Sequence, residues 1–115
     1  MNFIDSKLLQ NANDEAIYNI YLYLADKTAP KEYENLQSII VSLEAELRND
    51  RLKTWKDRDI YRLDILKNAV KSNSLLAYSK ISNLTVSKNG LTACSFIKPN
   101  GSISVVFKGT GDGEW

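Results

Sequence analysis

Leu91-Thr-Ala-Cys-Ser-Phe-Ile-Lys-Pro-Asn-Gly-Ser-Ile-Ser-Val-Val-Phe107 is the stretch that decides the fold, because it contains two apolar runs with a turn sequence between them. The runs cover 91–97 and 103–107, and Pro99-Asn-Gly101 lies in the middle of the connection. Proline in the second position of a turn and glycine in the fourth favour type I geometry. Two apolar runs joined by a short turn of this kind predict an antiparallel β-hairpin.

The second strand of this hairpin changes character along its length. Apolar and polar residues alternate in Ile103-Ser-Val105, but Val105-Val-Phe107 is uniformly apolar. Uniformly apolar strands are usually covered on both faces. We therefore expect helices to cover one face of this strand and a further element to cover the other. An open hairpin edge would instead invite pairing with another protein chain or self-association with a second copy.

Three helices are predicted before the hairpin from the spacing of apolar residues. The first is expected over 13–27, with Asn13 as its N-cap. The second is expected over 31–49, where a proline just upstream suits the first turn. The third is expected over 57–70, with Asp57 as its N-cap.

Asn73 suits a left-handed C-cap behind the third helix. Segment 74–88 is compatible with either a helix or a strand. The sequence therefore predicts an α+β chain, with about three N-terminal helices followed by a small antiparallel β-hairpin or sheet. We expect a single domain over 1–115, with a helical part in 1–73 and a β part in 74–115.

The composition is that of a globular chain. Hydrophobic residues make up 43% and charged residues 25% of the 115 residues, which suffices for one core without disulfides. No apolar stretch reaches the length of a membrane span. The N-terminal residues lack the basic start and apolar stretch of a signal peptide, so a cytoplasmic location is expected. Cys94 lies in an apolar strand without a second cysteine, which predicts a buried structural thiol.

The absence of histidine bears directly on chemistry. Histidine is the usual general base of serine and cysteine hydrolases and the commonest metal ligand. A single cysteine without histidine does not form a zinc site of the Cys/His kind. The nucleophile sequence Gly-x-Ser-x-Gly is missing. A dinucleotide-binding loop requires a helix directly after its glycines, and we expect none here, because two residues of the sequence follow Gly113. We therefore expect this chain to be no enzyme, with no metal and no cofactor.

The end of the second strand carries a family resemblance. Val105-Val-Phe-Lys-Gly-Thr110, followed by Trp115, resembles a stretch near the start of the catalytic domain in lipase-like α/β-hydrolases. These include the fungal-type triacylglycerol lipase family and its bacterial relatives. Their strand ends in Phe-Arg-Gly-Thr, so lysine stands here in place of the usual arginine. The resemblance implies that Thr110 lends a backbone N–H to an oxyanion hole and that Gly109 permits the tight turn.

This resemblance implies a function without catalysis. The chain is expected to be the N-terminal portion of a lipase-like serine hydrolase, either as a truncated gene product or as a fragment of a longer protein. Its fold would then be the incomplete start of an α/β-hydrolase. We expect it to be inactive by itself, because one oxyanion donor without a nucleophile or a base does not make an esterase.

A second hypothesis rests on the basic segment 48–62. Residues 1–47 contain three lysines and eight acidic residues, whereas this segment is rich in lysine and arginine. The candidate contact residues are Arg48, Arg51, Lys53, Trp55, Lys56, Arg58 and Arg62. Basic residues interleaved with an aromatic residue predict a small helical interaction module that binds nucleic acid or an acidic protein partner. The alternative is a solvated helix surface in which Trp55 anchors the core.

Overall fold

The computed structural model describes residues 3–87 and 91–108, with side chains from residue 13 onward. The elements, in chain order, are α1 (Phe3–Leu22), α2 (Leu36–Arg48), α3 (Asp57–Lys71), α4 (Ser74–Ala77), β1 (Lys80–Val86), β2 (Thr92–Ile97) and β3 (Ile103–Lys108). The three strands form one antiparallel sheet in the order β1-β2-β3. The predicted α+β class is confirmed, and segment 74–88 contains a short helix and then a strand.

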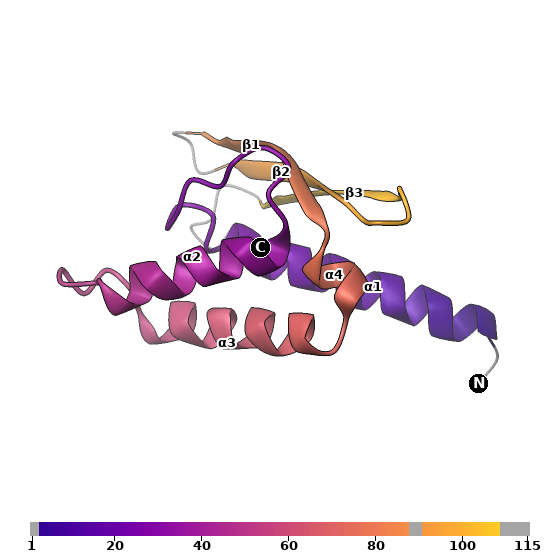
Figure 1. Cartoon of the computed structure of the whole chain (residues 1–115), viewed down its shortest axis with the longest axis horizontal. Coiled ribbons are helices and arrows are strands. Elements are labelled where there is room, and N and C mark those ends of the chain that lie inside the picture. The colour runs from indigo at the N-terminus through magenta and orange to yellow at the C-terminus, as the bar shows by residue number, and fades with distance from the viewer. Residues whose placement is uncertain (1–2, 88–90, 109–115) are drawn as a thin grey trace.

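The long helices lie on one side of the sheet (Figure 1). α1 contacts β2 and β3 from below, and α3 packs against both α1 and α2 on the side away from the sheet. The short α4 contacts α2 and α3 and leads the chain up into β1. The core therefore lies between the sheet and the helices, and one face of the sheet receives no helix from the described residues.

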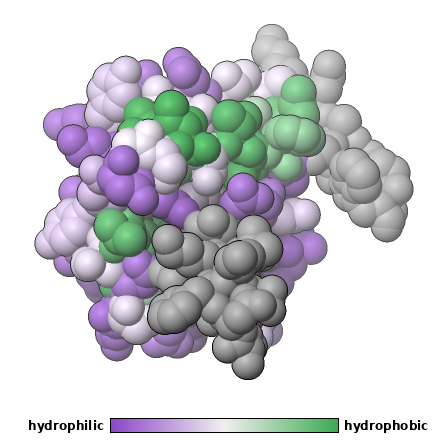
Figure 2. All heavy atoms as spheres, turned by 90° about the vertical axis from the view of Figure 1, so that its right-hand side faces the viewer, coloured by the Kyte–Doolittle hydropathy of each residue, from purple (hydrophilic) through white to green (hydrophobic). Residues whose placement is uncertain are grey.

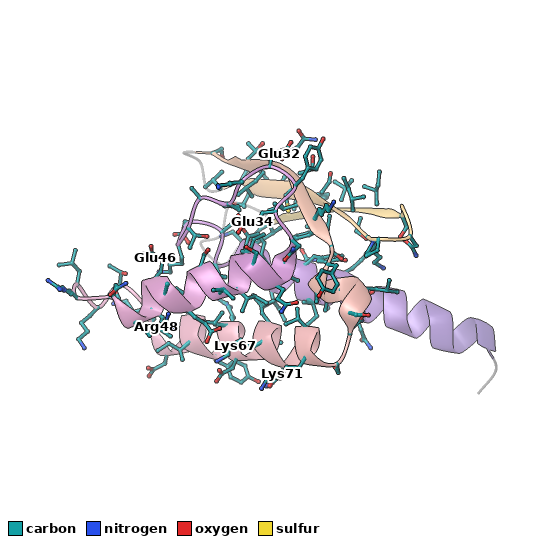
Figure 3. All side chains as sticks on the ribbon, viewed as in Figure 1. Glu32, Glu34, Glu46, Arg48, Lys67 and Lys71 are labelled. Atoms are coloured by element: carbon teal, nitrogen blue, oxygen red, sulfur yellow. The ribbon has the colours of Figure 1, made fainter. Side chains whose placement is uncertain are left out.

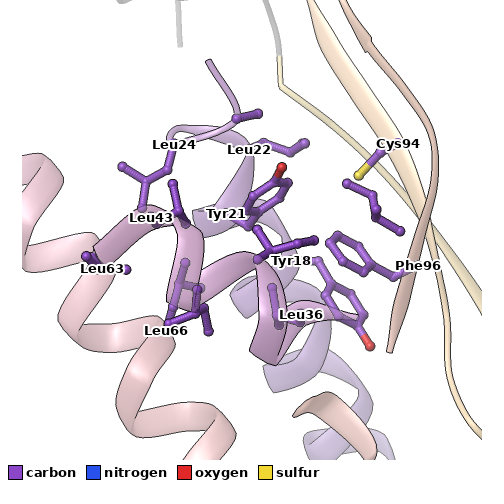
Figure 4. Packing of buried hydrophobic residues seen from close by; sticks show 14 of the residues in the cluster. Tyr18, Tyr21, Leu22, Leu24, Leu36, Leu43, Leu63, Leu66, Cys94 and Phe96 are labelled. Carbon is purple, nitrogen blue, oxygen red and sulfur yellow. The ribbon is translucent and has the colours of Figure 1, made fainter. Parts of the chain in front are cut away.

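An aromatic cluster joins α1 to the sheet (Figure 4). The rings of Tyr18 and Phe96 stack with their centroids 4.3 Å apart, and the Tyr21 ring meets Phe96 edge-on at 5.8 Å. All three side chains are fully buried. The hydroxyls of Tyr18 and Ser79 share a hydrogen bond of 2.7 Å. Burial raises the pKa of Tyr18 to about 12, because an ionised phenol would lose its hydration there.

A buried ion pair holds the hairpin turn against α1. Lys98 Nζ lies 3.1 Å from Asp14 Oδ2, and the two side chains are only 9% and 6% exposed. Asn73 Nδ2 donates a hydrogen bond of 3.3 Å to Asp14 Oδ1. Asp14 therefore connects α1, the hairpin and the start of α4. Removing either charge of this pair would destabilise the fold, because the remaining charge would be buried without a partner.

The first helix differs from its prediction at both ends. α1 begins at Phe3, so the prediction that Asn13 is its N-cap was wrong. The residues before Asn13 include leucine, lysine and glutamine, which are good helix formers and allow the helix to run through this position. α1 ends at Leu22, where Leu24 N–H donates to the Tyr21 carbonyl at 2.8 Å and tightens the chain into a turn.

The second helix begins later than predicted, because the stretch 31–35 pairs with the sheet instead. Tyr33 N–H donates a hydrogen bond of 2.7 Å to the Ile81 carbonyl in β1. α2 then starts at Leu36, with the Asn35 side chain as its N-cap. A strand-like pairing together with a side-chain cap thus prevails over the helix propensity of these residues.

Two predicted caps were also wrong. Lys56, and not Asp57, is the N-cap of α3, and its backbone N–H donates to Asp59 Oδ2 at 3.0 Å. Asn73 is not a left-handed C-cap, because its φ is −143°. Its side-chain oxygen accepts a hydrogen bond of 3.1 Å from Leu76 N–H and so caps the start of α4. An asparagine between two helices can cap the end of the first or the start of the second. The spacing of apolar residues does not show which of the two caps it forms.

The predicted hairpin is confirmed. Cys94 pairs with Val106 in the middle of β2 and β3. At the turn, Gly101 N–H donates to the Lys98 carbonyl at 2.8 Å, and Lys98 N–H donates to the Ser102 carbonyl at 2.9 Å. Gly101 has a φ of +89°, which glycine adopts without steric penalty. A left-handed residue after a tight turn is typical of three-residue hairpin loops and fixes the strand register.

Candidate functional site

The outer face of β3 is an exposed apolar row. Ile103, Val105 and Phe107 are 63%, 66% and 67% exposed, whereas Val106 between them is buried against the helices. Hydrophobic residues gather along the top of the molecule, over the sheet (Figure 2). The prediction that this strand is covered on both faces was therefore wrong for the described residues. The long helices pack beneath the sheet, so β3 has one face against the helices and one open face.

The same three residues of β3 also carry the free backbone groups at this edge of the sheet. In an antiparallel ladder every second residue directs both N–H and C=O toward the same neighbour. The bond from Lys98 N–H to the Ser102 carbonyl is the hydrogen-bonded pair next to the turn. Counting from Ser102 in steps of two residues, Ser104 and Val106 are the residues of β3 that bond to β2. Ile103, Val105 and Phe107 then direct their backbone groups away from β2. No described segment pairs with them, since β3 is last in the sheet order.

The opposite edge of the sheet is covered. Ile81 N–H donates to the Glu34 carbonyl at 2.9 Å, and Leu36 N–H donates to the Ser79 carbonyl at 2.9 Å. Glu32 also contacts β1, because its carboxylate accepts a hydrogen bond of 2.9 Å from Asn83 N–H. The loop before α2 therefore protects the β1 edge. Within the described part of the chain, β3 is the edge of the sheet that stays available.

The residues predicted to resemble an oxyanion hole follow directly from this edge. β3 ends at Lys108, and Gly109 and Thr110 lie outside the described residues. Lys108 Nζ lies 4.9 Å from the centroid of the Tyr23 ring, which directs this side chain toward the inner face. The glycine-rich segment therefore follows β3 directly in the sequence.

The basic segment does not form one surface. Arg48, Arg51, Lys53, Lys56 and Arg58 are exposed, and none of them makes an ion pair with another described residue. Trp55 is 8% exposed and belongs to the core, as its alternative interpretation predicts. Arg62 is directed inward, where it lies 3.8 Å from the Asp59 carboxylate and 4.3 Å from the Tyr23 ring. The structure therefore separates five exposed cations from the buried Trp55 and the half-buried Arg62.

The loop between α2 and α3 is organised by Asp50. One carboxylate oxygen accepts hydrogen bonds from Thr54 N–H at 2.9 Å and from its hydroxyl at 2.7 Å, and the other accepts from Trp55 N–H at 2.8 Å. The Thr54 hydroxyl is the largest cause that holds the pKa of Asp50 below its usual value. These bonds give the loop a defined shape, in which Lys53 has a φ of +56°.

The sequence interpretation overlooked Leu52. This side chain lies in the α2–α3 loop and is 86% exposed, more than any other large hydrophobic residue in the described part of the chain. Arg51 and Lys53 flank it. A lone aliphatic residue between two cations in a predicted connection was the available signal. It was missed because Trp55 dominated the interpretation of the segment.

Metal-ligand clusters and the reactivity of Cys94 bear on the chemistry of the described residues. No three potential metal ligands lie together among them. Cys94 is buried as predicted, and burial raises the pKa of its thiol to about 12, so the thiolate needed for nucleophilic attack does not form near neutral pH. None of the helices in the described ranges is long and apolar enough to cross a membrane.

Comparison of the chain with models of protein families, with curated proteins and with solved structures finds no match in any of the three.

Proposed function

We propose that this chain is the non-catalytic N-terminal part of a lipase-like serine hydrolase, and that it supplies the first strands of a larger sheet that continues beyond β3. The observation that carries the proposal is the free edge of β3 with its exposed apolar row. The resemblance of Val105-Val-Phe-Lys-Gly-Thr110 to a hydrolase strand supports it. The described part of this segment, 105–108, belongs to the strand that has no further neighbouring strand among the described residues.

The energetics of the edge favour a covering element. A neighbouring strand and the element behind it would remove Ile103, Val105 and Phe107 from water, and burial of such a side chain contributes about 1.5–3 kcal/mol. The strand would also pair with the free backbone groups of these residues. Natural sheets protect exposed edges with charges, prolines or bulges, and β3 contains none of these before Lys108.

Hydrogen exchange should reveal the open edge in the isolated chain. The amides of Ile103, Val105 and Phe107 face solvent, whereas those of Ser104 and Val106 bond to β2. We therefore expect alternating protection along β3, with exchange at least about tenfold slower at 104 and 106. Residue-resolved exchange measured by NMR on a dilute sample tests this. Uniform protection along β3 in a monomer would contradict the open edge.

The decisive comparison uses whatever the gene encodes after the Trp115 codon. The proposal expects an open reading frame with Gly-x-Ser-x-Gly and a later histidine. In the longer protein the Val105 amide should become protected, while the Val106 amide, already paired, serves as the internal control. A frame without these residues would overturn the relation to serine hydrolases. A Val105 amide that stays unprotected in the longer protein would overturn the continued sheet.

The chain itself should hydrolyse no ester. It lacks histidine and the nucleophile sequence, so the general base and the attacking serine of a hydrolase are both missing. The measurement is the release of p-nitrophenol from short-chain esters, with buffer as the blank. Turnover clearly above the blank would contradict the proposal that this part is non-catalytic. Turnover that survives replacement of every serine would contradict the serine-hydrolase relation.

A further inference from the structure

We propose that the α2–α3 loop is a membrane-surface contact that binds anionic lipid headgroups through its basic residues and inserts Leu52 below them. This inference is independent of the proposed function, because it rests on a different part of the molecule. Its partner is defined by two features of the loop. One is a protruding aliphatic side chain, and the other is a set of unpaired cations around it.

The position of the loop makes it accessible to a flat surface. It lies at one end of the long axis of the molecule (Figure 1), and Arg48 stands beside it at the end of α2 (Figure 3). Leu52 is 86% exposed within this loop. The hydrogen bonds of Asp50 to Thr54 and Trp55 fix the loop on the body of the protein. An ordered loop pays little conformational entropy when it binds.

Basic residues outnumber acidic residues in the loop sequence, which suits an anionic surface, while Asp26 and Glu46 line the hollow beside Arg51 and Leu52. Residues 48–58 contain five basic and two acidic residues. The five basic side chains are exposed and make no ion pair with the described residues. Asp50, one of the two acids, accepts the loop hydrogen bonds and keeps its negative charge, so residues 48–58 carry a formal net charge of +3. Clusters of lysine and arginine bind anionic lipids through such unpaired charge, and an adjacent apolar side chain adds insertion.

The same geometry disfavours nucleic acid as the partner. Sequence-independent binding of single strands combines cations with an exposed aromatic ring that stacks on bases. Trp55, the aromatic residue of the α2–α3 loop, is buried in the core, with Lys27 Nζ 5.4 Å from its ring centroid. The exposed aromatic ring of segment 48–62 is that of Tyr61, which lies in α3 and not in the loop. Leu52 provides no stacking surface, whereas the acyl region beneath lipid headgroups accommodates an aliphatic side chain.

Co-sedimentation with vesicles tests this inference. The intact chain should sediment with phosphatidylcholine vesicles that contain phosphatidylserine, and should remain in solution with phosphatidylcholine alone. Binding should weaken at high salt, because screening shortens the reach of surface charge. Leu52→Ser should weaken binding roughly tenfold, as expected for removing one buried leucine. The triple variant R51Q/K53Q/K56Q should weaken it roughly a hundredfold.

Matched variants separate the loop from general effects. K31Q/K71Q/K80Q removes the same charge from three exposed lysines outside the loop and should change binding less than about twofold. Val41→Ser removes another exposed aliphatic side chain, on α2, and should also bind normally. Equal losses in the control variants, or unchanged binding of Leu52→Ser, would overturn the inference. Binding to a short labelled DNA without binding to anionic vesicles would overturn it in favour of a nucleic-acid partner.

Discussion

Replacing Phe96 by alanine should lower the free energy of unfolding by about 3–5 kcal/mol, a large share of the 5–15 kcal/mol typical of a domain this size. Phe96 is fully buried and contacts both Tyr18 and Tyr21, so its loss opens a cavity between α1 and the sheet. Urea denaturation followed by far-ultraviolet circular dichroism measures the change.

Phe107 provides a matched control for this result. The variant Phe107→Ala removes the same side chain from the neighbouring strand, but Phe107 is 67% exposed on the outer face. Phe107→Ala should therefore change the stability of the isolated chain by no more than about 0.5 kcal/mol. Comparable losses in the two variants would mean that the outer face of β3 is covered, contrary to the structure described.

Removing Lys98 should be nearly as damaging. Lys98→Met leaves Asp14 without its cation in a site where both side chains are less than a tenth exposed. Breaking a buried pair in this way costs about 3–5 kcal/mol, because one charge remains without compensation. Chemical denaturation at neutral pH gives the magnitude. The remaining hydrogen bond from Asn73 does not replace a positive charge.

Two further variants identify the cause of that loss. D14N/K98M removes both charges and keeps an amide near Asn73, so it should recover about 1–3 kcal/mol relative to Lys98→Met. Lys67→Met breaks the ion pair between Lys67 and Glu44, two side chains that are each about one third exposed. This variant should lower the free energy of unfolding by less than about 1 kcal/mol. A double variant no more stable than Lys98→Met alone would show that the unpaired charge of Asp14 is not the cause of the loss.

The edge of β3 and the basic loop lie at different places on the molecule, and different interactions would bind a partner at each. The edge presents unpaired backbone groups beside apolar side chains, which a strand satisfies. The loop presents charge around one aliphatic side chain, which a charged surface attracts. Each proposal therefore has its own experiments, and failure of one leaves the other standing.

The hairpin, the α+β class and the buried state of Cys94 were predictable from sequence, because they depend on local patterns. Pro99-Asn-Gly101 specifies a turn through backbone preferences that neighbours do not change. The apolar run on each side of this turn predicts a strand. The burial of Trp55 was one of two stated alternatives, and the structure selects it.

The helix limits were less predictable, because capping residues can serve more than one purpose. Asn13 lies within α1, and Asn73 caps α4 instead of ending α3. Residues 31–35 have a helix-compatible sequence, but their backbone groups bond to β1, far away in the chain. A long-range partner of this kind leaves no trace in a local pattern.

The candidate surfaces divide in the same way. The amino-acid sequence alone established a β-hairpin leading into a glycine-rich segment, a basic stretch and the absence of histidine, because composition and short-range spacing suffice for these. Tertiary structure decided that Val105 faces outward, that Trp55 is enclosed and that Leu52 protrudes. The physical reason is that exposure depends on which elements pack against a residue, and the long helices pack beneath the sheet.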